Sequence, residues 1–183
     1  MISYSPTDPG DTERLHIRIS RTADVDGLVA LWTNPDAMRH TGGPRDGDFI
    51  AKEFGLYVEN PAHFARTEHE WWWSVIERSS GEFAGQCGLI EKEVEGQTEM
   101  ELVYFFLPAF WGKGYATEAA GRVAAHAFED IGFDSVVSII DPRNAASAGV
   151  ARKLGMRLDR DILRSDGVTR QVFRLDRATD AGE

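Results

Sequence analysis

The sequence predicts a single α+β domain in which a mixed central sheet of about seven strands is flanked by about four helices. Two observations lead to this fold class. Of the 183 residues, 42% are hydrophobic and 27% are charged, an ordinary balance for one globular domain with a real core. Strand patterns follow one another in the first half, whereas helices separate the strands in the second half, so antiparallel neighbours and helical crossovers share one sheet.

The first half begins with a strand at residues 15–20, where apolar and polar side chains alternate. Thr22 is a candidate N-cap for the helix that follows, and Asn34-Pro35 ends this helix. The remaining elements are a helix at 49–58 and strands at 71–77, 83–91 and 99–107.

In the second half, helices alternate with strands. A helix is predicted over 115–131 and a buried β-branched strand over 135–140. A short helix over 144–154 ends at Gly155, a residue suited to a left-handed C-cap. The last two strands form a hairpin, at 156–164 and 169–175.

The ends of the chain differ from the middle in composition. Residues 1–13 are rich in Pro, Asp, Ser and Thr and predict a disordered lead-in. Residues 14–176 form the predicted domain, and the polar residues 177–183 a loose tail.

Charge and cysteine content exclude several classes of function. The net charge of −10 argues against broad binding to nucleic acid or to an anionic membrane. We expect a cytoplasmic protein, because the chain has no signal-peptide pattern and no apolar run of about 20 residues. We expect no metal: the single cysteine, Cys87, excludes a Cys-based zinc site, and the five histidines lack ligand spacing. Cys87 itself lies in an apolar strand, which is typical of a small buried hydrophobe.

The most informative stretch runs from Leu107 to Ala119 and connects a predicted buried strand to a helix. Gly112 and Gly114 allow the backbone to approach a ligand closely, and the helix start offers free N–H groups to phosphate oxygens. The spacing is neither that of a P-loop nor that of a Rossmann turn. On the glycines alone, a tight turn without a ligand remains an equal alternative.

A second run, from Asp141 to Ser147, follows a strand and opens a helix. Together the two runs resemble the GCN5-related N-acetyltransferase (GNAT) superfamily, most closely the branch of the ribosomal-protein N-terminal acetyltransferases. The resemblance extends over about residues 15–175. It implies direct transfer of an acetyl group from acetyl-CoA to a small-molecule amine or a polypeptide N-terminus, by a monomer or homodimer.

The resemblance also implies roles for individual residues. The pyrophosphate of coenzyme A would bind the turn formed by Trp111, Gly112, Lys113, Gly114, Tyr115, Ala116 and Thr117. The pantetheine arm would pair with the strand formed by Leu102, Val103, Tyr104 and Phe105, and would also contact Asn144. Ser147 would lie near the sulfur, and Glu101 would accept the proton of the amine directly or through water.

Two positions depart from the superfamily pattern. Trp111 stands where Gln or Arg is usual, and the predicted last helix has no tyrosine to serve as general acid, so that role falls to Ser147, to water or to no group. Three alternatives stay open: Glu101 faces solvent at a strand end beside Glu99, Lys113 points outward, or Trp71-Trp72-Trp73 bind substrate instead of filling the core.

The acceptor loop, residues 38–48, contains Gly42-Gly43-Pro44 and the basic side chains Arg39, His40 and Arg45. The resemblance implies that this loop and residues 162–169 form the acceptor groove, and the basic side chains of the loop would favour an acceptor with an acidic group. A solvated loop without acceptor contact is an equal alternative. For the whole chain, the alternatives to an enzyme are a non-catalytic acyl-CoA-binding regulator and an unliganded interaction module.

Overall fold

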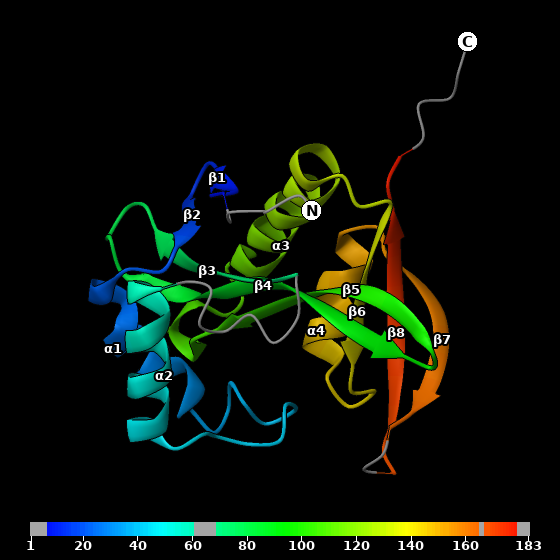
Figure 1. Ribbon diagram of the computed structural model, residues 1–183, viewed down its shortest axis with the longest axis horizontal. Coiled ribbons are helices and arrows are strands. Elements are labelled where there is room, and N and C mark those ends of the chain that lie inside the picture. The colour runs from blue at the N-terminus through cyan, green and yellow to red at the C-terminus, as the bar shows by residue number, and fades with distance from the viewer. Residues whose placement is uncertain (1–6, 61–68, 165–166, 179–183) are drawn as a thin grey trace.

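The computed structural model describes residues 7–60, 69–164 and 167–178, and these form one mixed sheet in the order β1-β2-β3-β4-β5-β6-β8-β7 (Figure 1). The predicted α+β fold class is confirmed, with eight strands instead of about seven. The strands are β1 (Gly10–Asp11), β2 (Leu15–Ile19), β3 (Glu70–Glu77), β4 (Phe83–Val94), β5 (Gln97–Phe106), β6 (Ser135–Ile140), β7 (Arg157–Leu163) and β8 (Thr169–Asp176).

The additional strand is β1, which lies within the segment that we expected to be disordered. It pairs with β2 through Gly10↔Ile17 and Asp11↔His16. Two residues are too few to show an alternating pattern, so the composition of this segment concealed the strand. The predictions for residues 1–6 and 179–183 lie outside the described residues.

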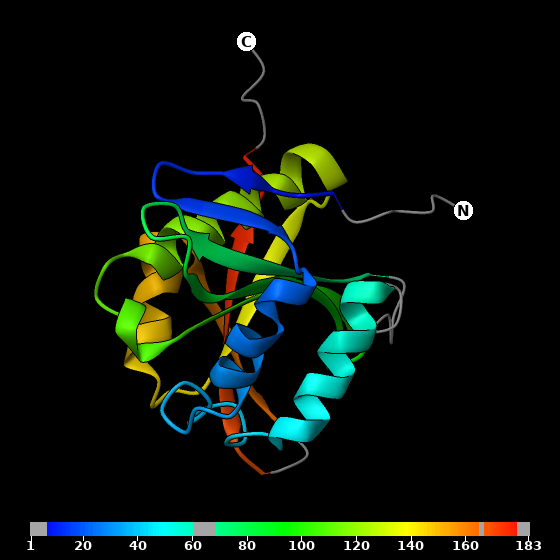
Figure 2. The same ribbon diagram turned by 90° about the vertical axis from the view of Figure 1, so that its left-hand side faces the viewer.

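Four helices cover the sheet: α1 (Val25–Trp32), α2 (Gly47–Glu59), α3 (Tyr115–His126) and α4 (Ala145–Lys153). Figure 2 shows α1 and α2 in front of the sheet and α3 behind it. The predicted helix over 115–131 is confirmed in extent, because α3 continues into a π-helical turn, Ala127–Ile131, that ends at Gly132. No helix of the described residues is long and apolar enough to cross a bilayer.

The three adjacent tryptophans fill the core, which the sequence favours over a substrate patch, and they do so on both faces of the sheet. Trp71 and Trp73 belong to the cluster beneath α3, and Trp72 belongs to the cluster beneath α1 and α2. Cys87 is fully buried in the first cluster, and burial raises the pKa of its thiol. It is therefore a structural hydrophobe and not a nucleophile.

One pair of strands differs from the others and creates the site. β5 and β6 are parallel and are paired only at Glu101↔Val137, whereas all other neighbouring strands are antiparallel. Just beyond this pair, the Ser138 hydroxyl donates to the Leu102 carbonyl (2.8 Å), in place of a strand amide. Among the described residues, 103–106 of β5 therefore have no strand partner on this side, while β4 still pairs with their other edge.

Candidate active site

A cleft of about 510 Å³ lies where β5 and β6 separate. Its walls come from five segments far apart in sequence: the loop after α1, the end of β5, the turn before α3, the end of β6 and the start of α4. Of the residues predicted to bind the cofactor, those that line it are Leu102, Val103, Tyr104, Phe105, Trp111, Gly112, Gly114, Tyr115, Ala116, Thr117, Asn144 and Ser147. The two predicted catalytic residues, Glu101 and Ser147, line it as well.

The phosphate turn, residues 111–117, has the backbone of an anion site. Gly112 and Gly114 have φ angles of +75° and +81°, which other residues adopt only with strain. Among the described residues, no hydrogen bond involves the backbone N–H of either glycine, and no side chain caps the first turn of α3. A Cβ atom built on Gly112 would meet nothing within 4 Å, so this turn leaves open space. Free amides beside open space at a helix N-terminus fit a pyrophosphate.

Trp111 and Lys113 both fold back onto the protein. The Trp111 indole N–H donates to the Phe106 carbonyl (2.7 Å), so it ties the turn to the end of β5, although the side chain is about half exposed. The Lys113 ammonium lies 3.5 Å from a Glu77 oxygen and above the ring of Phe110. Lys113 is not among the residues that line the cleft, and its side chain is 45% exposed although its ammonium is paired with Glu77.

Two side chains that the sequence does not point to, Arg14 and Glu77, support the phosphate turn from outside the cleft. Arg14 donates to the Lys113 carbonyl (2.9 Å) and forms an ion pair with Glu118 of α3 (2.6 Å). Glu77 of β3 accepts a hydrogen bond from the Tyr115 hydroxyl (2.5 Å), and this bond is the main reason that its pKa falls to about 2. These contacts hold the turn from the side away from the cleft, and the N–H groups of Gly112 and Gly114 have no hydrogen-bond partner among the described residues.

Glu101 is buried at the junction of β5 and β6, with 9% of its surface exposed. Its carboxylate lies 3.9 Å from the Lys92 ammonium. Burial raises its pKa, opposed by the charges of Lys92 and Arg164 and by a backbone hydrogen bond from Ile139. The solvent-facing alternative is therefore wrong. Glu99, two residues earlier, is also buried, but it is occupied by ion pairs with Arg160 (3.1 Å) and Arg174. Of these two glutamates, only Glu101 lines the cleft.

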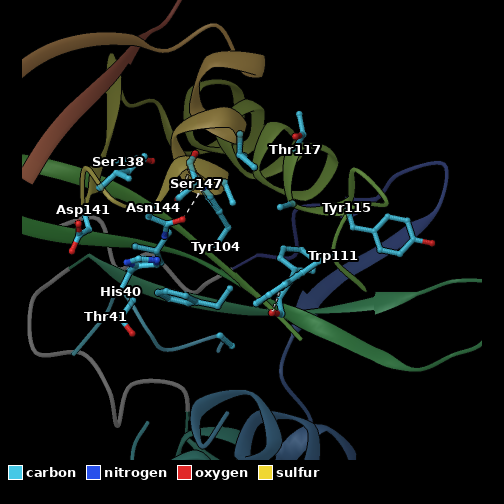
Figure 3. A pocket seen from close by; sticks show the side chains of 18 of the residues that line it. His40, Thr41, Tyr104, Trp111, Tyr115, Thr117, Ser138, Asp141, Asn144 and Ser147 are labelled. Atoms are coloured by element: carbon cyan, nitrogen blue, oxygen red, sulfur yellow. Dashed lines mark hydrogen bonds between the residues drawn. The ribbon is translucent and has the colours of Figure 1, made fainter. Parts of the chain in front are cut away.

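The start of α4 brings polar groups to the opposite wall. The Asn144 side-chain oxygen accepts from the Ser147 amide (3.1 Å) and caps the helix, which leaves its NH₂ group to meet a ligand. The Tyr104 hydroxyl donates to the Ser147 carbonyl (2.9 Å) and accepts from the Ser147 hydroxyl (3.3 Å). Figure 3 shows Tyr104, Asn144 and Ser147 together in this wall.

The acceptor loop contributes Arg39, His40 and Thr41 to the cleft. In the view of Figure 3, His40 and Thr41 lie below Asn144, and Ser147 lies above it. Arg39 forms an ion pair with Asp36 of the neighbouring turn. Arg45 is not among the lining residues: its guanidinium donates to the carbonyls of Gly43 (3.1 Å) and Thr41 (3.0 Å). Of the described part of residues 162–169, none lines the cleft.

Comparisons with known proteins agree with this geometry. The family described as "Acetyltransferase (GNAT) domain" matches residues 14–157. The uncharacterized protein YkkB of Bacillus subtilis is 33% identical over 152 residues, which cover 82% of this chain and 86% of YkkB. The crystal structure of an acetyltransferase from Agrobacterium tumefaciens superimposes with a TM-score of 0.75 at 28% identity, over 97% of this chain and 98% of the other.

Two neighbours with named acceptors are more distant. The spermidine N-acetyltransferase of Vibrio cholerae, solved with CoA and spermine, has a TM-score of 0.69 and 15% identity and covers 89% and 94% of the two chains. The ribosomal-protein-S5-alanine acetyltransferase of Vibrio fischeri has a TM-score of 0.71 and 14% identity and covers 91% and 94%. Such identities show the fold alone, so the ribosomal-protein branch predicted from the sequence is not singled out.

Proposed function

The chain belongs to the GNAT acetyltransferase family, and we propose that its cleft transfers an acetyl group from acetyl-CoA directly to the nitrogen of an acceptor amine. The observation that supports this most is the continuity of the cleft. It connects the free amides of the phosphate turn, past the unpaired edge of β5, to the buried carboxylate of Glu101.

Each wall of the cleft has a distinct task in this proposal. The amides of the phosphate turn bind the pyrophosphate, and residues 103–106 of β5 pair with the pantetheine arm through their free edge. The NH₂ group of Asn144 binds the same arm. Glu101 accepts the proton that the acceptor amine must lose, directly or through a water molecule. Its raised pKa makes it a stronger base than an exposed glutamate.

Acceptor basicity favours one class of amine. An α-amino group has a pKa near 8, so making it neutral at pH 7 requires about one pKa unit, or about 1.4 kcal/mol. A lysine or polyamine nitrogen with a pKa of about 10.4 requires about 3.4 units, close to 5 kcal/mol. One buried carboxylate is adequate for the first demand and insufficient for the second. We therefore propose a polypeptide N-terminus or a small amine of low pKa as the acceptor.

A thiol-release assay with acetyl-CoA and a panel of acceptors tests this function. The matched pair is one peptide with a free N-terminus and the same peptide with a blocked N-terminus and a free lysine; polyamines, amino acids and aminoglycosides complete the panel. We expect release with the free N-terminus or a small α-amine, and much less with polyamines. If the protein binds CoA but no amine of the panel leads to thiol release, the protein is an acyl-CoA-binding regulator and the proposal is wrong.

A further inference from the structure

The Tyr104 hydroxyl occupies an unusual position in the cleft. Tyr104 belongs to the residues of β5 that face α3, and its side chain crosses to the first turn of α4, where it meets Ser147. A third hydroxyl, that of Ser138 on β6, also lines the cleft and interacts with Tyr104. Two strands and one helix thus bring three hydroxyl groups to one wall, and the sequence spacing of these residues does not indicate it.

The hydrogen bonds of Tyr104 leave its proton available to a ligand. The Ser147 carbonyl lies within α4, where the amide four residues later already bonds to it, so the carbonyl does not depend on the tyrosine. The Ser147 hydroxyl donates to the phenol oxygen (3.3 Å), which polarises the phenol O–H bond. The phenol can therefore turn from this carbonyl to a stronger acceptor without leaving a buried group unpaired.

Acetyl transfer creates such an acceptor. This step rests on the proposed function: as the thioester breaks, negative charge collects on the sulfur. Helix α4 contains no tyrosine, so the helix that carries Ser147 supplies no phenol itself. We propose that the Tyr104 hydroxyl, oriented by Ser147, donates a hydrogen bond to the departing thiolate sulfur.

The electrons and protons balance as follows. The amine nitrogen forms a bond to the carbonyl carbon, the carbon–sulfur bond breaks, and its electron pair stays on sulfur. The proton of the amine passes to Glu101 or to water. Tyr104 retains its own proton throughout, and the thiolate takes a proton from water after release.

The acidities of the two groups explain why the phenol donates a hydrogen bond and not its proton. Burial raises the pKa of Tyr104 to about 12, opposed by the hydroxyls of Ser147 and Ser138. A thiol has a pKa of about 8.5, so full transfer from phenol to thiolate is unfavourable by roughly 10³-fold. The same raised pKa keeps the phenol protonated, and hence a donor, over the whole working pH range.

The pKa of the CoA thiol in its complex with the protein tests the proposal without turnover. It is measured by ultraviolet absorbance of the thiolate during a pH titration, with desulfo-CoA as the blank. A hydrogen bond to a charged group stabilises the thiolate roughly 10- to 100-fold, so we expect Tyr104→Phe to raise the bound thiol pKa by about one to two units. The kcat should fall by a similar factor, with CoA affinity retained.

Tyr57→Phe is the matched control. The Tyr57 hydroxyl is also buried and donates to a backbone carbonyl, that of Trp72 (2.8 Å), but Tyr57 does not line the cleft. This variant should leave the thiol pKa unchanged. Ser147→Ala, which keeps the phenol and removes its orienting donor, should raise the thiol pKa by less than Tyr104→Phe does.

The outcomes separate the two proposals. A wild-type protein that binds CoA and transfers acetyl, with a bound thiol pKa that neither Tyr104→Phe nor Ser147→Ala moves, overturns the role of Tyr104 and leaves the function intact. If Tyr104→Phe does not fold, the titration of Ser147→Ala decides by the same criterion. A wild-type protein without acetyl transfer overturns both.

Discussion

Replacing Gly112 with alanine tests the phosphate turn in a way that separates ligand binding from folding. A Cβ atom at Gly112 meets no protein atom within 4 Å, so the new methyl group collides only with a ligand. Gly96, in the turn between β4 and β5, provides the matched control. Its φ of +80° is close to the +75° of Gly112, and a Cβ there also meets nothing within 4 Å.

The expected magnitudes differ for stability and for affinity. Alanine at a positive φ costs about 1–2 kcal/mol in the folded state. About 0.4–1 kcal/mol of this is offset because alanine restricts the unfolded chain. Both variants should therefore lose about 1 kcal/mol of unfolding free energy. Only Gly112→Ala should also lose an amide–phosphate hydrogen bond, worth about 1.5–3 kcal/mol, which weakens CoA binding roughly 10- to 150-fold.

Calorimetry with CoA and urea unfolding measure the two quantities on the same preparations. We expect equal stability losses in the two variants and an affinity loss in Gly112→Ala alone. Unchanged CoA affinity in a folded Gly112→Ala protein would refute the assignment of the turn. Equal affinity losses in both variants would show that the effect is a general one on folding.

Four further predictions concern single side chains. Glu101→Gln should lower kcat roughly 10²- to 10⁴-fold, most strongly below the pKa of the acceptor, and a pH–rate profile equal to that of the wild type would exclude Glu101 as the base. The pKa of Glu101 is raised in the folded protein, so the protonated side chain stabilises the fold at low pH and this contribution is lost as pH rises. Thermal melts should therefore find Glu101→Gln more stable than the wild type at pH 7, by a margin that shrinks towards pH 4. The pKa of Glu77 is lowered to about 2, so its contribution is present above the unfolded value of about 4.3 and lost as pH falls through the folded value. Urea unfolding should find Glu77→Gln less stable than the wild type at pH 7, by a margin that shrinks as pH falls towards 2; a margin that is the same at pH 7 and pH 2 would contradict this. Arg39→Ala should raise the KM of an acidic acceptor by up to about fivefold, the strength of an exposed ion pair, without changing the KM of acetyl-CoA. Arg45→Ala should affect all acceptors alike, because Arg45 donates to the loop's own carbonyls. If Arg39→Ala leaves every acceptor KM unchanged, this arginine does not contact the acceptor.

The sequence predicts those features that depend on local pattern. The β-branched run of β6 predicts the observed bounds, Ser135–Ile140, and the glycines after α3 and α4 have the positive φ angles of left-handed caps. The phosphate turn was also visible, because its glycines and the following helix are adjacent in the chain. Trp71 to Trp73 were assigned to the core because alternate side chains of a strand face opposite sides of the sheet.

The features that the sequence did not predict depend on distant contacts. Arg14 supports the turn through Glu118, 104 residues away, and Tyr104 meets Ser147 across 43 residues. No periodicity records such pairs, because they arise only when the sheet and helices pack. The acceptor loop shows the same limit of local pattern. Composition makes this loop basic, but only the structure shows that Arg45 donates to the loop's own backbone and that Arg39 pairs with Asp36.

The most direct test of the central proposal is a paired quantification of products. Released CoA thiol and acetylated acceptor are measured together, with acetyl-CoA and the best amine of the panel, by absorbance and by mass spectrometry. We expect equal amounts of the two products and no acetylated protein when the amine is omitted, since the amine attacks the thioester directly. Thiol release without acetylated amine, or an acetyl group that accumulates on the protein, would contradict direct transfer in this cleft.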